Sequence, residues 1–165
     1  MEEIGKGQVD KKELFNSLVY MKDEKASQIL ELLLENEIPL DTDELYEFLI
    51  YSDVKQSGQY LAEAVKNGKY KITDENGLTN IMLYLDEDEA GEILRAVMDD
   101  GEFFTFRLLA ENIIYLGEKE QEQCILHYLD RGYSLTYSQF MEISPYLSER
   151  TIEKIDERVE YYKGN

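Results

Sequence analysis

The sequence predicts an all-α protein, more specifically a right-handed α-solenoid of about five two-helix repeats of 31–33 residues. Two landmarks recur along the 165 residues with nearly the same period. Tyrosines stand 31, 33, 31 and 31 residues apart, at Tyr20, Tyr51, Tyr84, Tyr115 and Tyr146. Seventeen residues after the first four stand Glu37, Gly68, Gly101 and Gly132, and eighteen after the fifth stands Gly164. Periods of about 20 to 50 residues are typical of stacked repeat arrays.

The landmarks divide the chain into an N-terminal tail, 1–10, and one helical-repeat domain, 11–165. We expect the repeats to cover about 11–40, 41–72, 73–105, 106–136 and 137–165. In each repeat, a first helix ends near the tyrosine and a second helix ends just before the closing position. The expected first helices are 11–21, 43–52, 77–85, 107–116 and 138–147. The expected second helices are 23–36, 54–67, 87–100, 118–131 and 149–162.

Each second helix is framed by residue types that favour helix ends. Two residues after the tyrosine come residues that cap a helix N-terminus by satisfying free backbone N–H groups: Asp53, Asp86, Gly117 and Ser148. Three positions later, the capping-box position holds Gln56, Glu89 and Glu120. Glycine at the closing position supplies the left-handed conformation that ends a helix. The chain has only two prolines, so little else interrupts the helices.

Apolar positions that match between copies predict the core. In the second helices these are Ile29, Tyr60, Ile93, Cys124 and Ile155, followed by Leu33, Ala64, Val97, Tyr128 and Val159. In the first helices, the positions six, five, two and one before the tyrosine, and the position after it, are mostly apolar. At about 100° per residue these positions form one apolar arc. We therefore expect the tyrosine to lie on the opposite, polar side.

That polar side holds the candidate partner contacts. Four residues before the tyrosine stand Asn16, Glu47, Asn80, Glu111 and Glu142. Tyrosines flanked by carboxylates can bind Arg and Lys through cation–π contacts and charge-assisted hydrogen bonds. A tyrosine can also lie flat between neighbouring copies, with its ring buried and its hydroxyl wet, and recurrence in every copy favours this structural role. The candidate partner-binding residues are Glu44, Glu47, Tyr51, Asn80, Tyr84, Glu111, Tyr115 and Glu142.

Charge is the unusual bulk property. The chain has 36 acidic and 17 basic residues, a formal net charge of −19. Such a field repels phosphate backbones and anionic membranes and attracts basic protein surfaces, although acidic surfaces also simply keep proteins soluble. The start of the chain has no signal-peptide pattern, no apolar run is long enough to span a membrane, and a single cysteine suits a reducing compartment. We expect a cytoplasmic protein that binds neither nucleic acid directly nor a membrane.

The residues most often used in catalysis have structural explanations. Cys124 occupies a core position that other copies fill with isoleucine. His127, the only histidine, has no Cys or His partner nearby, which favours an exposed or locally bonded imidazole. The acidic stretch 85–92 lacks the alternating ligands of a calcium loop and is explained by a capped helix start. We expect no enzymatic activity, no metal site and no cofactor.

Residues 73–105, TDENGLTNIMLYLDEDEAGEILRAVMDDGEFFT, resemble an ankyrin repeat. Gly77 and Thr79 match the G-x-T that opens the first ankyrin helix, and EILRAVMDDG is similar to the second helix with its closing glycine. Asn80 and Met82 replace the Pro and His of that motif, and the connecting segments are short for ankyrin hairpins, so HEAT-like repeats are the alternative. Either family implies a binding surface. In ankyrin-like arrays the polar side of the first helix faces the concave groove.

These features favour a protein-binding module, more specifically an acidic inhibitor or immunity-type protein that neutralises a basic partner such as a nuclease toxin. The acids would steer the encounter, and aromatic anchors would supply the desolvated contact. One alternative is a DNA mimic that inhibits a nucleic-acid-binding protein. Another is a structural adaptor that joins two proteins.

Overall fold

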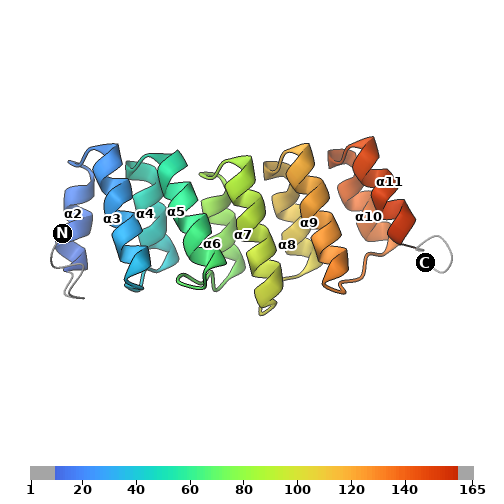
Figure 1. Ribbon diagram of the computed structural model, residues 1–165, viewed down its shortest axis with the longest axis horizontal. Coiled ribbons are helices and arrows are strands. Elements are labelled where there is room, and N and C mark those ends of the chain that lie inside the picture. Colours follow the sequence, from blue (N-terminus) through green and yellow to red (C-terminus); the bar gives the residue numbers. More distant parts are fainter. Residues whose placement is uncertain (1–9, 160–165) are drawn as a thin grey trace.

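The computed structural model describes residues 10–159, and all regular secondary structure in that range is helical, as the sequence predicts (Figure 1). The first helices of the successive pairs are α2 (Lys11–Leu18), α4 (Thr42–Tyr51), α6 (Glu75–Met82), α8 (Phe106–Asn112) and α10 (Tyr137–Ile143). The second helices are α3 (Asp23–Glu35), α5 (Val54–Lys66), α7 (Glu87–Asp100), α9 (Glu118–Asp130) and α11 (Glu149–Arg158). Short 3₁₀ turns follow two of the first helices, η1 (Ile113–Tyr115) and η2 (Ser144–Tyr146).

The helices form two layers along one direction (Figure 1). In the second-helix layer, α3 packs against α5, α5 against α7, α7 against α9 and α9 against α11. In the first-helix layer, α2, α4, α6, α8 and α10 pack in the same order. Contacts such as those of α4 with α3 and α5 join the layers. Helices α2 and α11 therefore lie at opposite ends of an elongated molecule.

The hydrophobic core lies between the two layers. Most of the predicted core positions of the second helices are fully buried: Ile29, Leu33, Ala64, Ile93, Val97, Cys124, Tyr128 and Ile155. Tyr60 and Val159 are only partly buried and pack against this core. First-helix residues such as Leu45, Phe48 and Leu78 close the core from the other side. Within residues 10–159, no helix combines the length and the apolar character needed to cross a bilayer.

The predicted N-caps are confirmed for three of the four second helices. Asp53, Asp86 and Ser148 each accept a hydrogen bond from the backbone N–H three residues later, whereas Gly117 has no side chain to do so. The capping boxes predicted at Gln56, Glu89 and Glu120 are wrong, because no reciprocal bond forms there. The Glu120 carboxylate instead binds Arg95 of the neighbouring helix at 2.6 Å.

Complete capping boxes are found on two first helices instead. They join Asp41 to Glu44 and Thr136 to Gln139. Sequence spacing alone does not separate these positions from the second-helix starts, where Arg95 holds the Glu120 carboxylate. A buried side-chain oxygen of Gln56 and one of Glu89 form no hydrogen bond with the described residues.

The closing glycines Gly68, Gly101 and Gly132 are left-handed, as predicted, and Glu37 at the same position after α3 is left-handed as well. Positive φ angles occur in the described chain at Gly68 (75°), Gly101 (72°), Gly132 (88°) and, as the one non-glycine residue, Glu37 (53°). The four residues share one repeat position, so the backbone reverses direction at the same point after α3, α5, α7 and α9. Gly164, the last part of the predicted helix 149–162 and residues 1–9 of the predicted tail lie outside the described residues.

We expect Glu37→Gly to raise the free energy of unfolding by about 0.5–1 kcal/mol. The left-handed conformation destabilises a non-glycine residue by about 1–2 kcal/mol, and glycine removes this cost. Part of that stabilisation is lost because glycine also increases the conformational entropy of the unfolded chain. Urea denaturation measures the change.

The matched control is Gly68→Ala, at the same repeat position. A Cβ there meets nothing within 4 Å, so only its backbone conformation is penalised. This variant should lose about 1 kcal/mol. Equal stability of Glu37→Gly and wild type would contradict the strain at residue 37.

Candidate functional site

The outer side of the first-helix layer brings half of the candidate contact residues into one row. Asn16, Glu47, Asn80, Glu111 and Glu142 are all exposed. They occupy the same position on α2, α4, α6, α8 and α10, which pack in that order. Corresponding positions on stacked helices lie in line, and we call this line the acid–amide row.

The carboxylates on this side differ in how freely they can bind a partner. Glu44 completes the capping box with Asp41 and also binds the Lys11 ammonium at 3.2 Å, so its carboxylate already has partners within the chain. Glu111 binds Arg107 at 2.8 Å on the exposed surface, where such a pair is weak and easily exchanged. Glu47 and Glu142 form no ion pair with any residue in 10–159. These two are the most available acids of the row.

The recurring tyrosines do not form a uniform ladder. Tyr20 is 89% exposed, and Tyr51 and Tyr146 are also exposed, whereas Tyr84 and Tyr115 are partly buried against the core. The Tyr84 hydroxyl lies 2.9 Å from that of Tyr46, and the two rings meet edge to face at 5.2 Å between α4 and α6. The hydrogen bond to Tyr46 raises the pKa of Tyr84. Tyr84 thus has the packing role between copies, and Tyr20 and Tyr146 do not.

The expected core arc of the first helices is wrong at the position just before the tyrosine, and also at Met141, five residues before Tyr146, which is 50% exposed. The residue just before the tyrosine was expected to face the core, but it is exposed in four copies: Val19 by 52%, Ile50 by 43%, Leu83 by 62% and Ile114 by 52%. The buried position is instead three residues before the tyrosine, which holds Phe48, Ile81, Asn112 and Ile143. The amide of Asn112 is accommodated there because it donates to the Leu108 carbonyl at 2.9 Å.

Helix geometry explains the difference. The buried positions six, three and two before the tyrosine centre the core arc at about 110° from the tyrosine, using about 100° per residue. The position just before the tyrosine then lies about 150° from that centre, on the outer side. Most first helices also end before the tyrosine, and the chain continues with tighter bonds such as Tyr20 N–H to Ser17 O and Tyr84 N–H to Ile81 O. The tyrosine therefore lies at the flank of the helix.

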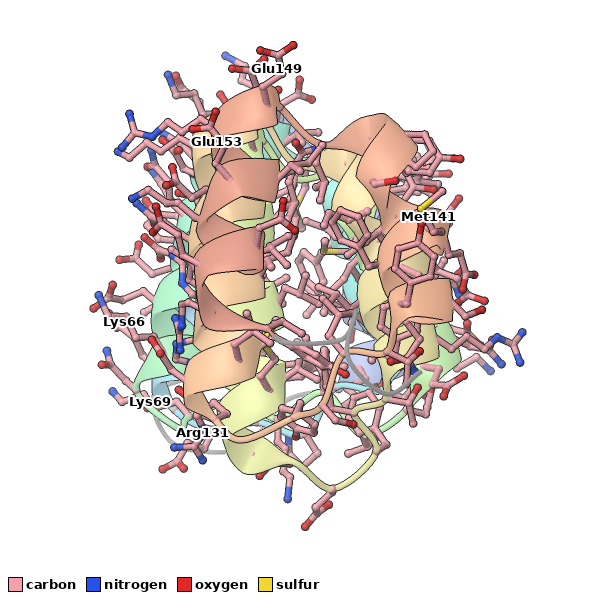
Figure 2. All side chains as sticks on the ribbon, turned by 90° about the vertical axis from the view of Figure 1, so that its right-hand side faces the viewer. Lys66, Lys69, Arg131, Met141, Glu149 and Glu153 are labelled. Carbon is pink, nitrogen blue, oxygen red and sulfur yellow. The ribbon has the colours of Figure 1, made fainter. Side chains whose placement is uncertain are left out.

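Two parallel rows result on the outer side of the first-helix layer. Val19, Ile50, Leu83 and Ile114 form what we call the apolar row. Each of them lies three residues, or about one turn, after a member of the acid–amide row. Met141 on α10 adds a further exposed apolar side chain to this layer, on the side of the molecule away from Lys66, Lys69 and Arg131 (Figure 2). Exposed apolar side chains that gather on one side and are rimmed by polar residues mark interaction surfaces.

Several basic side chains of the second-helix layer form ion pairs between neighbouring helices. Arg95 of α7 binds Glu120 of α9, and Lys154 of α11 binds Glu122 of α9 at 2.9 Å. Neither the acid–amide row nor the apolar row contains a basic residue. The net negative charge is therefore not offset within the two rows.

The remaining chemically reactive residues have structural roles. Cys124 is fully buried, as predicted, and burial raises the pKa of its thiol to about 12. The His127 imidazole is locally bonded, with Nε2 2.7 Å from the Asp99 carboxylate. Among the described residues, no three His, Cys, Asp or Glu side chains are grouped so that they could hold a metal ion.

Comparisons of the chain with protein families, with curated proteins and with solved structures found no match. The apolar row and the acid–amide row are therefore described from this chain alone.

We expect Leu83→Ser to change the free energy of unfolding by less than about 0.5 kcal/mol, because Leu83 lies in water in the free protein. Its neighbour Met82 is 1% exposed, and Met82→Ala should cost about 2–5 kcal/mol through the cavity it leaves. Urea denaturation of the two variants gives the comparison. A loss for Leu83→Ser as large as that for Met82→Ala would place the apolar row in the core.

We expect Cys124 in the native protein to resist thiol reagents at pH 8. The raised pKa keeps the sulfur protonated at that pH, and only the thiolate reacts. In urea the Cys124 thiol should be labelled rapidly, because unfolding exposes it and returns its pKa to the ordinary value. Labelling followed by absorbance in the native and unfolded states makes the test, and equally fast reaction in both would contradict the burial of this side chain.

Proposed function

We propose that this protein is a binding module that takes a basic protein on the outer side of its first-helix layer. The carrying observation is the apolar row lying one turn from the acid–amide row. Apolar side chains such as Leu83 and Ile114 supply the desolvated contact, and exposed acids such as Glu47 and Glu142 supply attraction and orientation. Packing of corresponding helices extends both rows along the molecule.

The proposal includes a repeat architecture. We infer a right-handed α-solenoid of about five two-helix repeats, of ankyrin-like or HEAT-like type. The alternation of helices between two layers and the shared left-handed position after four of the second helices support it. The ankyrin-like assignment rests on Gly77 and Thr79 and on the period of the chain.

Within this class we favour an inhibitor or immunity-type protein that neutralises a basic partner such as a nuclease toxin. A net charge of −19 accelerates association with a cationic surface, and a chain with no proposed catalytic group acts by occlusion. The apolar row argues against a DNA mimic, because a duplex presents charged phosphates along its whole edge. The single cysteine supports a cytoplasmic location.

The first test compares wild type with Leu83→Ser/Ile114→Ser as bait for proteins from the source cell. We expect a basic protein that the wild type retains and the double variant loses, with an affinity at least about tenfold lower, as for central anchors of an interface. The matched control is Glu153→Gln, on the exposed surface of α11 in the other layer. It should keep the affinity within about twofold.

The rates of association and dissociation test the contribution of the exposed acids to partner binding. Glu47→Gln/Glu142→Gln should slow association and flatten the fall of affinity with salt, while dissociation changes little. Stopped-flow or surface-based kinetics at several salt concentrations measure this. Partners that are neutral, that bind independently of salt, or that the double variant Leu83→Ser/Ile114→Ser retains fully would overturn the proposal.

A further inference from the structure

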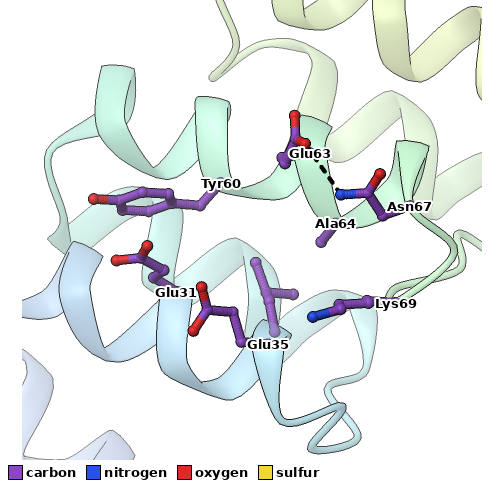
Figure 3. Close-up of a pocket in the computed structure, with 8 residues that line it drawn as sticks. Glu31, Glu35, Tyr60, Glu63, Ala64, Asn67 and Lys69 are labelled. Atoms are coloured by element: carbon purple, nitrogen blue, oxygen red, sulfur yellow. Dashed lines mark hydrogen bonds between the residues drawn. The ribbon is translucent and has the colours of Figure 1, made fainter.

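A pocket of about 120 Å³ lies in the second-helix layer, between α3 and α5 (Figure 3). Glu31 and Glu35 form its α3 side, and Tyr60, Glu63 and Ala64 form its α5 side. Lys69, just after α5, reaches its edge and points toward Glu35. This layer faces away from the apolar row, so the pocket is separate from the proposed partner surface.

The pocket exists because the second copy departs from the repeat at two positions. Where Tyr60 stands, the other copies have buried Ile29, Ile93, Cys124 and Ile155. Tyr60 is too large for that core position and remains partly exposed. Ala64 stands where other copies have Leu33, Val97 and Tyr128, and its small side chain leaves the space unfilled. A large aromatic next to a small residue thus opens a hollow with an aromatic wall and an apolar floor.

Two carboxylates face this wall without a basic partner. Glu31 and Glu35 are four residues apart on α3 and therefore project from the same side of the helix. No basic side chain in residues 10–159 forms an ion pair with either of them. Burial, followed by the negative charge of Glu31, raises the pKa of Tyr60. Glu63 differs, because the Asn67 amide donates to it at 3.1 Å.

Other contacts within this layer show what such carboxylates bind. Glu122 of α9 forms ion pairs with the Lys154 ammonium and the Arg150 guanidinium of α11. Glu120 of α9 accepts the Arg95 guanidinium of α7. Between α3 and α5 no basic side chain of residues 10–159 pairs with these carboxylates, and an open pocket lies there instead.

We propose that this pocket binds the guanidinium end of an arginine side chain from a partner protein. The planar group would stack on the Tyr60 ring and donate to the Glu31 and Glu35 carboxylates, a combination that guanidinium serves better than ammonium. Ligand pockets for drug-sized molecules are about 300–1,000 Å³, so this volume suits one side-chain head group. Lys69 sits at the edge as a competing cation.

The test titrates the full-length protein with ethylguanidinium and follows backbone amide signals by NMR. We expect saturable shifts confined to α3, α5 and the segment around Lys69. The uncharged isostere N-ethylurea should cause none. Shifts spread evenly over the acidic surface would overturn the proposal, because they would report only the net charge.

Variants locate the site. Tyr60→Ile, which restores the residue of three other copies, and Glu35→Gln should each weaken binding about threefold to tenfold. Ala64→Leu should weaken binding because the larger side chain fills the pocket. Lys69→Gln should strengthen binding because it removes the competing cation. Glu24→Gln, the same charge change at an exposed site of α3, is the matched control and should alter affinity by less than about twofold. Unchanged binding by folded Tyr60→Ile and Ala64→Leu would refute the site.

The source of the guanidinium is decided by a second ligand, N-acetyl-arginine-N-methylamide. Binding at least as tight as that of ethylguanidinium supports an arginine held within a protein chain. Binding more than about tenfold weaker would show that the pocket excludes a backbone and takes a free cation, which overturns the partner-protein assignment. Leu83→Ser should leave both titrations unchanged, so failure here is distinguishable from failure of the proposed partner surface.

Discussion

The structure depends on burial of one side of every helix against the helices of the neighbouring pairs. Helices this short are marginal in isolation, and one pair of them cannot cover its own apolar face. The contacts from α3 through α5, α7 and α9 to α11, together with the parallel series in the first-helix layer, make a continuous apolar seam between the layers. Burial along this seam supplies the apolar contacts that the fold needs. Residues on the outer sides of both layers are therefore not constrained by the core.

Small residues at the contacts between neighbouring second helices have different consequences, according to what fills the space beside them. At the contact of α7 with α9, a Cβ at Gly91 would collide with the Glu120 carboxylate. The missing side chain therefore makes room for Glu120, which binds Arg95, while the Cys124 thiol donates to the Gly91 carbonyl at 3.6 Å. At the contact of α3 with α5, the departures at Tyr60 and Ala64 leave an unfilled pocket. Packing within the chain explains the missing side chain at Gly91, whereas nothing within the chain fills the pocket beside Tyr60 and Ala64.

The two layers also differ in electrostatic character. Ion pairs join α7 to α9 and α9 to α11, so much of the basic charge in the second-helix layer is locally neutralised. In the first-helix layer, Lys11 pairs with Glu44 and Arg107 with Glu111, but Glu47 and Glu142 of the acid–amide row form no ion pair with any residue in 10–159. In the proposed binding function, the long-range field of the protein would attract cationic partners, and short-range discrimination would fall to apolar and aromatic side chains such as Leu83 and Tyr51.

The sequence by itself determined the helical class, the starts of α2 to α11 to within two residues, the capping residues Asp53, Asp86 and Ser148, and the left-handed closing glycines Gly68, Gly101 and Gly132. Most first helices end three or four residues earlier than predicted. These features are local, because each depends on hydrogen bonds or backbone angles within a few residues. Periodicity also identified the core of the second helices, where one repeated position faces the same neighbour in every copy.

Only the tertiary structure decided which side of the first helices faces outward. The sequence predicted that the apolar row belongs to the core, because apolar character does not distinguish a buried residue from an exposed contact residue. The row consists of Val19, Ile50, Leu83 and Ile114. Their exposure follows from where the first helices end and how they rotate against the second layer. The pocket at Tyr60 likewise required both α3 and α5 to be placed, because the residues that line it are up to 38 positions apart (69 − 31) in the chain. Local sequence patterns determine where the helices lie in the chain, and packing between the helices determines which side chains are exposed on the surface.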